Sequence, residues 1–238
     1  MRGIALPTHD WIAILDFGSQ YSQLIARRIR EQNVYCELVR FNTPATDLQA
    51  RKPAGIILSG GPASVLAEGA PWCDPALYHL GIPILGICYG MQMTAQCLGG
   101  RVKPGREREY GPARIRIEAA APIFKDLDAS QAVWMSHGDQ VAELPEGFRG
   151  LAGTDTCPYA AMGDDRRRIY GLQFHPEVVH TPNGIAILRH FIFDICGCSG
   201  DWEMAQFVRE SVRTIQEKTA GGHVVLGLSG GVDSSVVA

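Results

Sequence analysis

The chain has 238 residues, a length typical of one full domain, or of one domain and part of a second. Its composition, 46% hydrophobic and 20% charged, is close to that of folded globular proteins and excludes collagen, coiled coils and wholly disordered chains. The net charge of −3, from 22 Lys and Arg against 25 Asp and Glu, lacks the basic excess that neutralises phosphates, so we expect no nucleic-acid partner.

Residues 1–10 form an N-terminal lead that we predict to be disordered. This lead lacks the apolar stretch of a signal peptide, and no later run approaches the roughly 18 apolar residues that a membrane helix needs. We therefore expect a cytoplasmic protein with no membrane partner. The odd number of cysteines, seven, favours reduced thiols over a disulfide framework.

The next part of the chain alternates between strands and helices. Residues 11–16 are a short apolar run, and residues 21–32 follow with apolar side chains at helical spacing. Pro83 is expected at the start of its strand, because proline cannot donate to a neighbouring strand. Strands separated by helices indicate a parallel sheet. The further predicted elements are strands at residues 34–41, 55–58 and 82–85 and a helix at residues 91–98.

From residue 101 to residue 173 the pattern changes to short alternating runs separated by glycine and proline. These runs, at residues 114–118, 132–135 and 169–174, predict strands that either extend the sheet or form a small antiparallel one. Residues 183–195 carry the apolar spacing of a closing helix. We therefore predict a first domain over residues 11–198.

Residues 199–238 are predicted to begin a second α/β unit without completing it. A helix is expected from residue 202 to about residue 219, followed by a buried strand at residues 223–228. Cys196 and Cys198, just before this unit, lack the further ligands that a tetrahedral zinc site requires, so no metal site is predicted. The predicted fold class is α/β: an open, mostly parallel sheet with flanking helices, a short antiparallel region and an incomplete second unit.

The segment Gly86-Ile87-Cys88-Tyr89-Gly90 lies between a predicted strand and a predicted helix. Two glycines permit a tight turn that lifts the middle side chain above the carboxyl edge of the sheet, as in a nucleophile elbow. The positive end of the following helix dipole favours a thiolate there. Cys88 is therefore the candidate nucleophile.

Two further segments follow predicted strands and end at the same edge of the sheet. His175 and Glu177 lie two residues apart, so their side chains point the same way, and Glu177 can orient the imidazole as the third member of a nucleophile–base–carboxylate set. The turn Ser59-Gly60-Gly61-Pro62 can present backbone N–H groups to an oxyanion. Each segment alone is weak evidence, but their coincidence at strand ends favours one site.

With these segments in view, the chain resembles the glutamine amidotransferases that use a Cys, His and Glu triad, and within them the GMP synthetase family. The resemblance covers nearly the whole chain. It is carried by Ile14-Leu15-Asp16-Phe17-Gly18-Ser19-Gln20, Leu58-Ser59-Gly60-Gly61-Pro62, Gly86 to Gln92, Met135-Ser136-His137-Gly138-Asp139, Gln173-Phe174-His175-Pro176-Glu177 and the tail from Cys196 to Trp202 and from Leu228 to Ser235.

The resemblance implies roles for individual residues. Cys88 attacks the side-chain amide of glutamine, His175 relays protons, and a thioester forms before water releases glutamate and leaves ammonia for use. The oxyanion is held by the backbone N–H groups of Gly61 and Tyr89. Glutamine binding or contact with the partner domain is assigned to Gln92, Ser136, His137, Gly138 and Asp139, and the glutaminase itself needs no cofactor.

The resemblance also implies a second, incomplete site in an ATP pyrophosphatase domain. Its loop would grip the pyrophosphate of ATP and is formed by Ser229, Gly230, Gly231, Val232, Asp233, Ser234 and Ser235. The complete synthetase would use ATP and Mg²⁺ to activate XMP, which ammonia converts to GMP, and would be a homodimer. The loop lacks the lysine of a Walker A sequence. We expect that this chain alone cannot make GMP.

Three alternatives stay open at the sequence level. The chain could be the glutaminase of another amidotransferase, such as a carbamoyl or anthranilate synthase, although the segment from Ser136 to Asp139 and the tail argue against it. It could be a non-catalytic regulatory module of the same fold with a structural Cys88. It could also be a cysteine peptidase, which shares the nucleophile chemistry.

Overall fold

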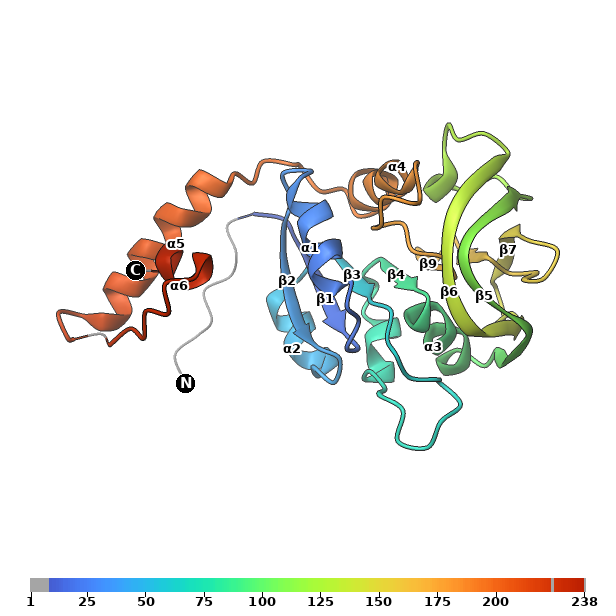
Figure 1. The fold of residues 1–238 in the computed structure, drawn as a ribbon, viewed down its shortest axis with the longest axis horizontal. Coiled ribbons are helices and arrows are strands. Elements are labelled where there is room, and N and C mark those ends of the chain that lie inside the picture. The colour runs from blue at the N-terminus through green and yellow to red at the C-terminus, as the bar shows by residue number, and fades with distance from the viewer. Residues whose placement is uncertain (1–8, 224, 238) are drawn as a thin grey trace. The chain divides into compact units, whose positions relative to one another are not determined.

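The computed structural model describes residues 9–223 and 225–237 (Figure 1). The chain divides into two compact units whose boundary lies between Asp201 and Trp202. Most of the lead predicted to be disordered, residues 1–8, lies outside the described residues. Within the described part, no helix combines the length and apolar character needed to span a bilayer.

The first unit is built on one nine-stranded sheet with the order β2-β1-β3-β4-β9-β8-β7-β5-β6. Strands β2, β1, β3, β4 and β9 are parallel, and β8, β7, β5 and β6 continue the same sheet in antiparallel pairings. The predicted parallel sheet is thus confirmed, and the runs between residues 101 and 173 extend it. The bounds are β1 Trp11–Asp16, β2 Tyr35–Arg40, β3 Gly55–Leu58, β4 Ile84–Ile87, β5 Arg101–Ile117, β6 Ser130–Glu143, β7 Arg149–Gly153, β8 Ala161–Asp164 and β9 Ile169–Leu172.

Successive side chains of the parallel strands pack alternately into two separate hydrophobic cores. Ile12 and Ile14 of β1 face one cluster with α1 (Ser22–Arg30), α4 (Gly184–Arg189) and η3 (His190–Ile195), joined by η2 (Pro122–Phe124). Ala13 and Leu15 face the other cluster with α2 (Ala45–Arg51), η1 (Pro75–His79) and α3 (Tyr89–Cys97). Helices therefore cover both faces of the parallel part, which explains why its inner strands β1, β3, β4 and β9 are almost entirely apolar.

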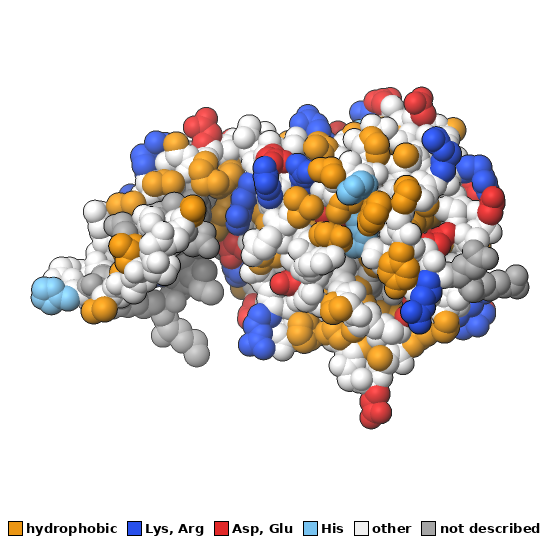
Figure 2. Space-filling model, viewed as in Figure 1, with side chains coloured by type: hydrophobic (Ala, Val, Ile, Leu, Met, Phe, Trp, Pro, Cys, Tyr) orange, Lys and Arg blue, Asp and Glu red, His pale blue; other side chains and the backbone are white. Residues whose placement is uncertain are grey.

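Three helical segments of this unit, α2, η1 and η2, have no counterpart in the sequence prediction, because each is too short to show a clear helical period. The predicted closing helix is present as α4, which continues directly into the π-helical turn η3. On the face shown in Figure 2, Lys and Arg side chains are interspersed with Asp and Glu side chains between hydrophobic ones. This mixing is consistent with the nearly balanced net charge.

The described part of the second unit contains two helices, α5 (Met204–Thr219) and α6 (Val232–Val237). The predicted helix from residue 202 begins two residues late, whereas the predicted strand at residues 223–228 is wrong for its described part, residues 223 and 225–228. Val225 is 97% exposed and Leu228 is 61% exposed. An apolar segment becomes a strand only when another strand pairs with it, and none of the described residues does so here.

Candidate active site

Cys88 lies at the turn from β4 into α3, with backbone angles of φ 51° and ψ −104°. Its two glycine neighbours allow α3 to approach the sheet closely. A Cβ atom on Gly86 would lie 2.6 Å from the backbone of Gly90, and one on Gly90 would lie 2.3 Å from the carbonyl oxygen of Leu58. The expected elbow is therefore present, and it holds Cys88 in a conformation that side chains rarely adopt.

The imidazole of His175 is fixed beside the elbow by several contacts. Its Nδ1 atom hydrogen-bonds with Oε1 of Glu177 at 2.7 Å, and both side chains are almost fully buried. The backbone N–H of His175 donates to the carbonyl of Trp134 at 3.0 Å, and the hydroxyl of Thr181 donates to the carbonyl of His175 at 2.7 Å. The ring of Tyr21 meets the imidazole edge-on, with centroids 5.2 Å apart. The imidazole is therefore oriented before any substrate arrives.

The environment of His175 raises its pKa to about 10. Burial opposes the charged form, but hydrogen bonds with Cys88 and Glu177, together with the negative charges of these two groups, outweigh it. The second carboxylate oxygen of Glu177, Oε2, is buried and has no hydrogen-bond partner among the described residues. The carboxylate therefore depends on the imidazolium for its compensation. This arrangement favours an imidazolium beside Cys88 at neutral pH.

The glycine turn after β3 lies against the same two side chains. A Cβ atom on Gly60 would come within 3.2 Å of Cε1 of His175 and 3.8 Å of Cβ of Cys88. Gly61 is next in the chain, and a Cβ atom there would lie 3.5 Å from the ring of Tyr89. No described residue accepts a hydrogen bond from the backbone N–H of Gly61 or Tyr89. Two unused donors thus lie near the thiol.

Cys88 lines two adjoining pockets. The larger, of about 670 Å³, extends over α3 and the β5–β6 hairpin, and the smaller, of about 300 Å³, contains His175 and the segment after β1. The thiol can thus be reached from two sides. The larger pocket is lined by Gly61, Pro62, Ala63, Ser64, Cys88, Tyr89, Gln92, Pro104, Gly105, Arg108, Tyr110, Ser136, His137, Gly138 and Asp139.

All the residues predicted to bind glutamine line this larger pocket, but several are already engaged with one another. The amide nitrogen of Gln92 donates to the carbonyl of Asp139 at 2.7 Å and to Oε1 of Gln173 at 3.2 Å. The hydroxyl of Ser64 donates to the carboxylate of Asp139. Cys88 Sγ lies 3.5 Å from the carbonyl oxygen of Ser136. The segment from Ser136 to Asp139, which is part of β6, is therefore held over the elbow by α3.

Sequence reasoning assigned no role to Gln173, whose Nε2 atom lies 3.7 Å from Cys88 Sγ. Its position two residues before His175 was the available signal. Arg108 and Tyr110 on β5 were also missed, although both line the larger pocket. Only the pairing of β5 with β6 brings them there, and nothing in the local sequence reveals that register.

The loop predicted to bind pyrophosphate lies in the second unit, before and within α6. Its hydroxyl groups hydrogen-bond within the loop: Ser229 Oγ lies 3.0 Å from Ser234 Oγ, and Ser235 Oγ donates to the carbonyl of Gly231 at 2.8 Å. The side chain of Asp233 lies outside the described part. The loop is thus compact, and no residue of the catalytic triad belongs to its unit.

Comparisons with known proteins give two family matches, "Glutamine amidotransferase class-I" over residues 13–195 and "NAD synthase" over residues 202–238. GMP synthases from Aliivibrio fischeri and Acetivibrio thermocellus are 52% and 51% identical to the chain over 97% of its length. The chain spans only 45% of each of these relatives.

Solved structures give the same picture of the fold. The crystal structure of a GMP synthase subunit from Thermoplasma acidophilum is 28% identical, with a TM-score of 0.68, and the match covers 89% of this chain and 99% of that one. A glutamine amidotransferase from Thermotoga maritima matches with a TM-score of 0.62 at 18% identity, over 80% of this chain and 99% of that one.

Proposed function

Because the chain belongs to the class-I glutamine amidotransferase family, we propose that its first unit hydrolyses glutamine to glutamate and ammonia. The observation that carries the proposal is the set formed by Cys88 on a strained elbow, the His175 imidazole with its raised pKa and the buried Glu177 carboxylate. These three groups supply a nucleophile, a proton carrier and an orienting charge.

The proposed reaction balances with these groups alone. Sγ of Cys88 attacks the amide carbon of the glutamine side chain, and its proton is carried by His175. The backbone N–H groups of Gly61 and Tyr89 stabilise the oxyanion that forms. Imidazolium then gives the proton to the leaving nitrogen, so ammonia departs and a thioester remains. Water adds to the thioester with His175 as the base, which releases glutamate and restores the thiol.

The larger pocket supports glutamine as the substrate. Cys88 lies at one of its walls, and Gln92 and the β6 segment from Ser136 to Asp139 form another. We propose that backbone groups of this segment and Arg108 bind the α-amino and α-carboxylate groups, since a guanidinium pairs well with a carboxylate. A non-catalytic module has no need of a strained cysteine.

For the complete protein we propose the synthesis of GMP, in which ammonia aminates XMP that ATP has activated. The similarity to GMP synthases and the match of residues 202–238 to an ATP-using family support this proposal. The described hydroxyls of the loop from Ser229 to Ser235 suit phosphate oxygens. We propose that Mg²⁺ comes with ATP, that the complete enzyme is a dimer, and that it works in the cytoplasm.

Glutamate release and labelling by an electrophilic glutamine analogue test the glutaminase proposal. The purified chain should release glutamate and carry one label on Cys88, whereas the Cys88→Ala variant should do neither. The Cys36→Ala variant is the matched control, because Cys36 is buried in β2 away from the pockets, and it should behave as the unmodified chain. Undiminished glutamate release by Cys88→Ala, or a label on another residue, would contradict the proposed mechanism.

A further inference from the structure

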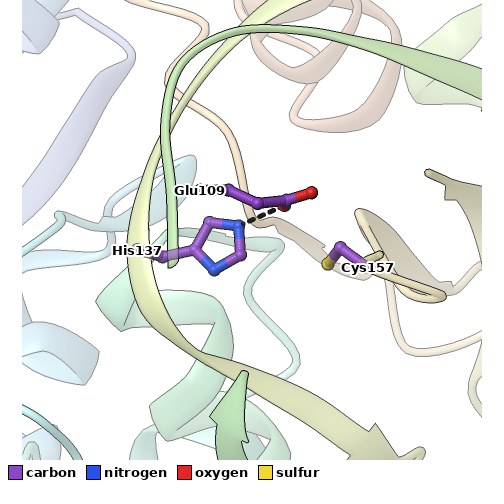
Figure 3. Close-up of side chains that lie close together, drawn as sticks. All are labelled: Glu109, His137 and Cys157. Carbon is purple, nitrogen blue, oxygen red and sulfur yellow. Dashed lines mark hydrogen bonds and ion pairs between the residues drawn. The ribbon is translucent and has the colours of Figure 1, made fainter. Parts of the chain in front are cut away.

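Three potential metal ligands from distant parts of the first unit meet beside the larger pocket. Glu109 comes from β5, His137 from β6, and Cys157 from the connection between β7 and β8 (Figure 3). Their ligand atoms, a carboxylate oxygen, an imidazole nitrogen and Sγ, all lie within 4.8 Å of one another. In Figure 3 the sulfur of Cys157 points toward the pair formed by Glu109 and His137. The triad of the glutaminase uses none of these side chains.

Both nitrogen atoms of the His137 ring lie within hydrogen-bond distance of an oxygen atom. Its Nδ1 atom lies 3.0 Å from the carbonyl oxygen of Asp139, and its Nε2 atom lies 2.9 Å from Oε2 of Glu109. Both partners are acceptors when Glu109 is ionised. A neutral imidazole has only one N–H, and the carbonyl requires it on Nδ1. A cation is therefore needed between Nε2 and Oε2, either a proton or a metal ion.

The second oxygen of Glu109 is fixed by the connection that carries Cys157. The hydroxyl of Thr154 donates to Oε1 of Glu109 at 3.2 Å, and the hydroxyl of Thr156 donates to the same atom. Thr154 also accepts a hydrogen bond from the backbone N–H of Cys157 at 2.8 Å. Oε2 is thereby directed to His137, in the way that outer hydrogen bonds orient the ligands of a metal site.

The ligand atom types of the three side chains indicate which metal ion they would bind. A thiolate, an imidazole and a carboxylate together suit Zn²⁺, which binds all three at about 2.0 to 2.3 Å in a tetrahedron. Ligand atoms in such a tetrahedron lie about 3.5 Å apart, so shifts of about 1 Å complete the geometry. Thiolate and carboxylate also neutralise the two charges of the ion, which allows it to be buried.

We propose that Glu109, His137 and Cys157 form a zinc site that fastens the β7–β8 connection to the β5–β6 hairpin behind the glutamine pocket. His137 belongs to both the site and the pocket wall, so the metal would fix one wall of the pocket. The three protein ligands leave one tetrahedral position for water or a substrate atom. The sequence prediction of no metal site considered only neighbouring cysteines and could not see this set.

Metal binding is tested on the whole chain carrying Cys88→Ala, which removes the catalytic thiol as a competing ligand. After dialysis against a chelator, this parent should bind one Co²⁺ with the near-ultraviolet absorption of a thiolate–cobalt bond, and Zn²⁺ should displace the Co²⁺. Adding Cys157→Ser should abolish the absorption. Adding Cys36→Ser should leave it unchanged, because Cys36 is an equally buried thiol that bonds to the Ala26 carbonyl.

A second variant, Glu109→Gln, tests the proposal even if Cys157→Ser does not fold. Glu109→Gln keeps the shape of the side chain and removes its charge, so it should weaken Zn²⁺ binding at least tenfold in competition with a chromophoric chelator. Circular dichroism shows whether each variant is folded, and if Cys157→Ser is not, Glu109→Gln decides. The proposal is overturned by an unchanged cobalt spectrum in folded Cys157→Ser or by unchanged Zn²⁺ affinity in Glu109→Gln. It is also overturned if the parent binds no stoichiometric metal, and in that case a proton lies between His137 and Glu109.

Discussion

The strained backbone at Cys88 predicts an unusual response to glycine. Its φ of 51° with ψ of −104° is a conformation that glycine adopts freely and other residues avoid. Replacing Cys88 by Ala keeps a Cβ atom and therefore keeps the strain, whereas Cys88→Gly removes it. The change from Ala to Gly at this position should thus be far less harmful than at an ordinary buried cysteine.

Cys36 provides the ordinary reference position. It is fully buried in β2 and does not have a positive φ. There, Gly should be less stable than Ala by about 0.5 to 1 kcal/mol from chain entropy, plus the loss of one buried methyl group. Both costs also apply at Cys88, but there the relief of backbone strain stabilises the Gly variant by about 1 to 3 kcal/mol. The Ala-to-Gly change should therefore be more favourable at Cys88 by about 2 kcal/mol.

Thermal and urea unfolding of the four variants measure this difference directly. For a chain of this size, about 2 kcal/mol corresponds to a difference of about 4 to 8 °C in melting temperature. All four variants should show native circular dichroism, and both Cys88 variants should lack glutaminase activity. Equal Ala-to-Gly changes at Cys88 and Cys36 would show that the elbow stores no strain and would refute the reasoning.

Two further predictions concern the elbow and the base. Gly90→Ala places a Cβ atom 2.3 Å from Leu58 O, against an ordinary contact of about 3.4 Å, so α3 must shift by about 1 Å. We expect the free energy of unfolding in urea to fall by about 3 kcal/mol and the labelling of Cys88 to slow about 100-fold. The control Gly227→Ala, with open space around it, should match the parent. Equal labelling rates for Gly90→Ala and the parent would contradict this prediction. In the folded chain His175 has a pKa of about 10, above its unfolded value of about 6.5. Its contribution to the free energy of unfolding is therefore complete below about pH 6.5 and is lost as the pH rises through about 10. The unfolding free energy of the parent should therefore fall relative to His175→Gln over that range, and Glu177→Gln should move the fall to lower pH; parallel pH curves for parent and His175→Gln would be inconsistent with the raised pKa.

Strands and helices with a strong repeating pattern were predictable because local sequence determines them. The apolar run of β1 and the helical spacing of α1 place these elements within a residue or two of their observed bounds. The segment at residues 225–228 shows the limit of this reasoning. Its apolar residues favour a strand, but pairing with another strand is a tertiary interaction, and without it the segment is exposed.

The same division applies to the candidate sites. Cys88, His175 and Glu177 were identifiable from the sequence, because each lies where a predicted strand ends and parallel strands bring their carboxyl ends to one edge. Arg108, Tyr110 and the set of Glu109, His137 and Cys157 were not, because they come together only through the register of an antiparallel hairpin and a distant connection. Local periodicity and strand ends thus determined the parallel half and its nucleophile. The pairing of distant strands, which no local pattern encodes, decided the pocket wall and the second cluster.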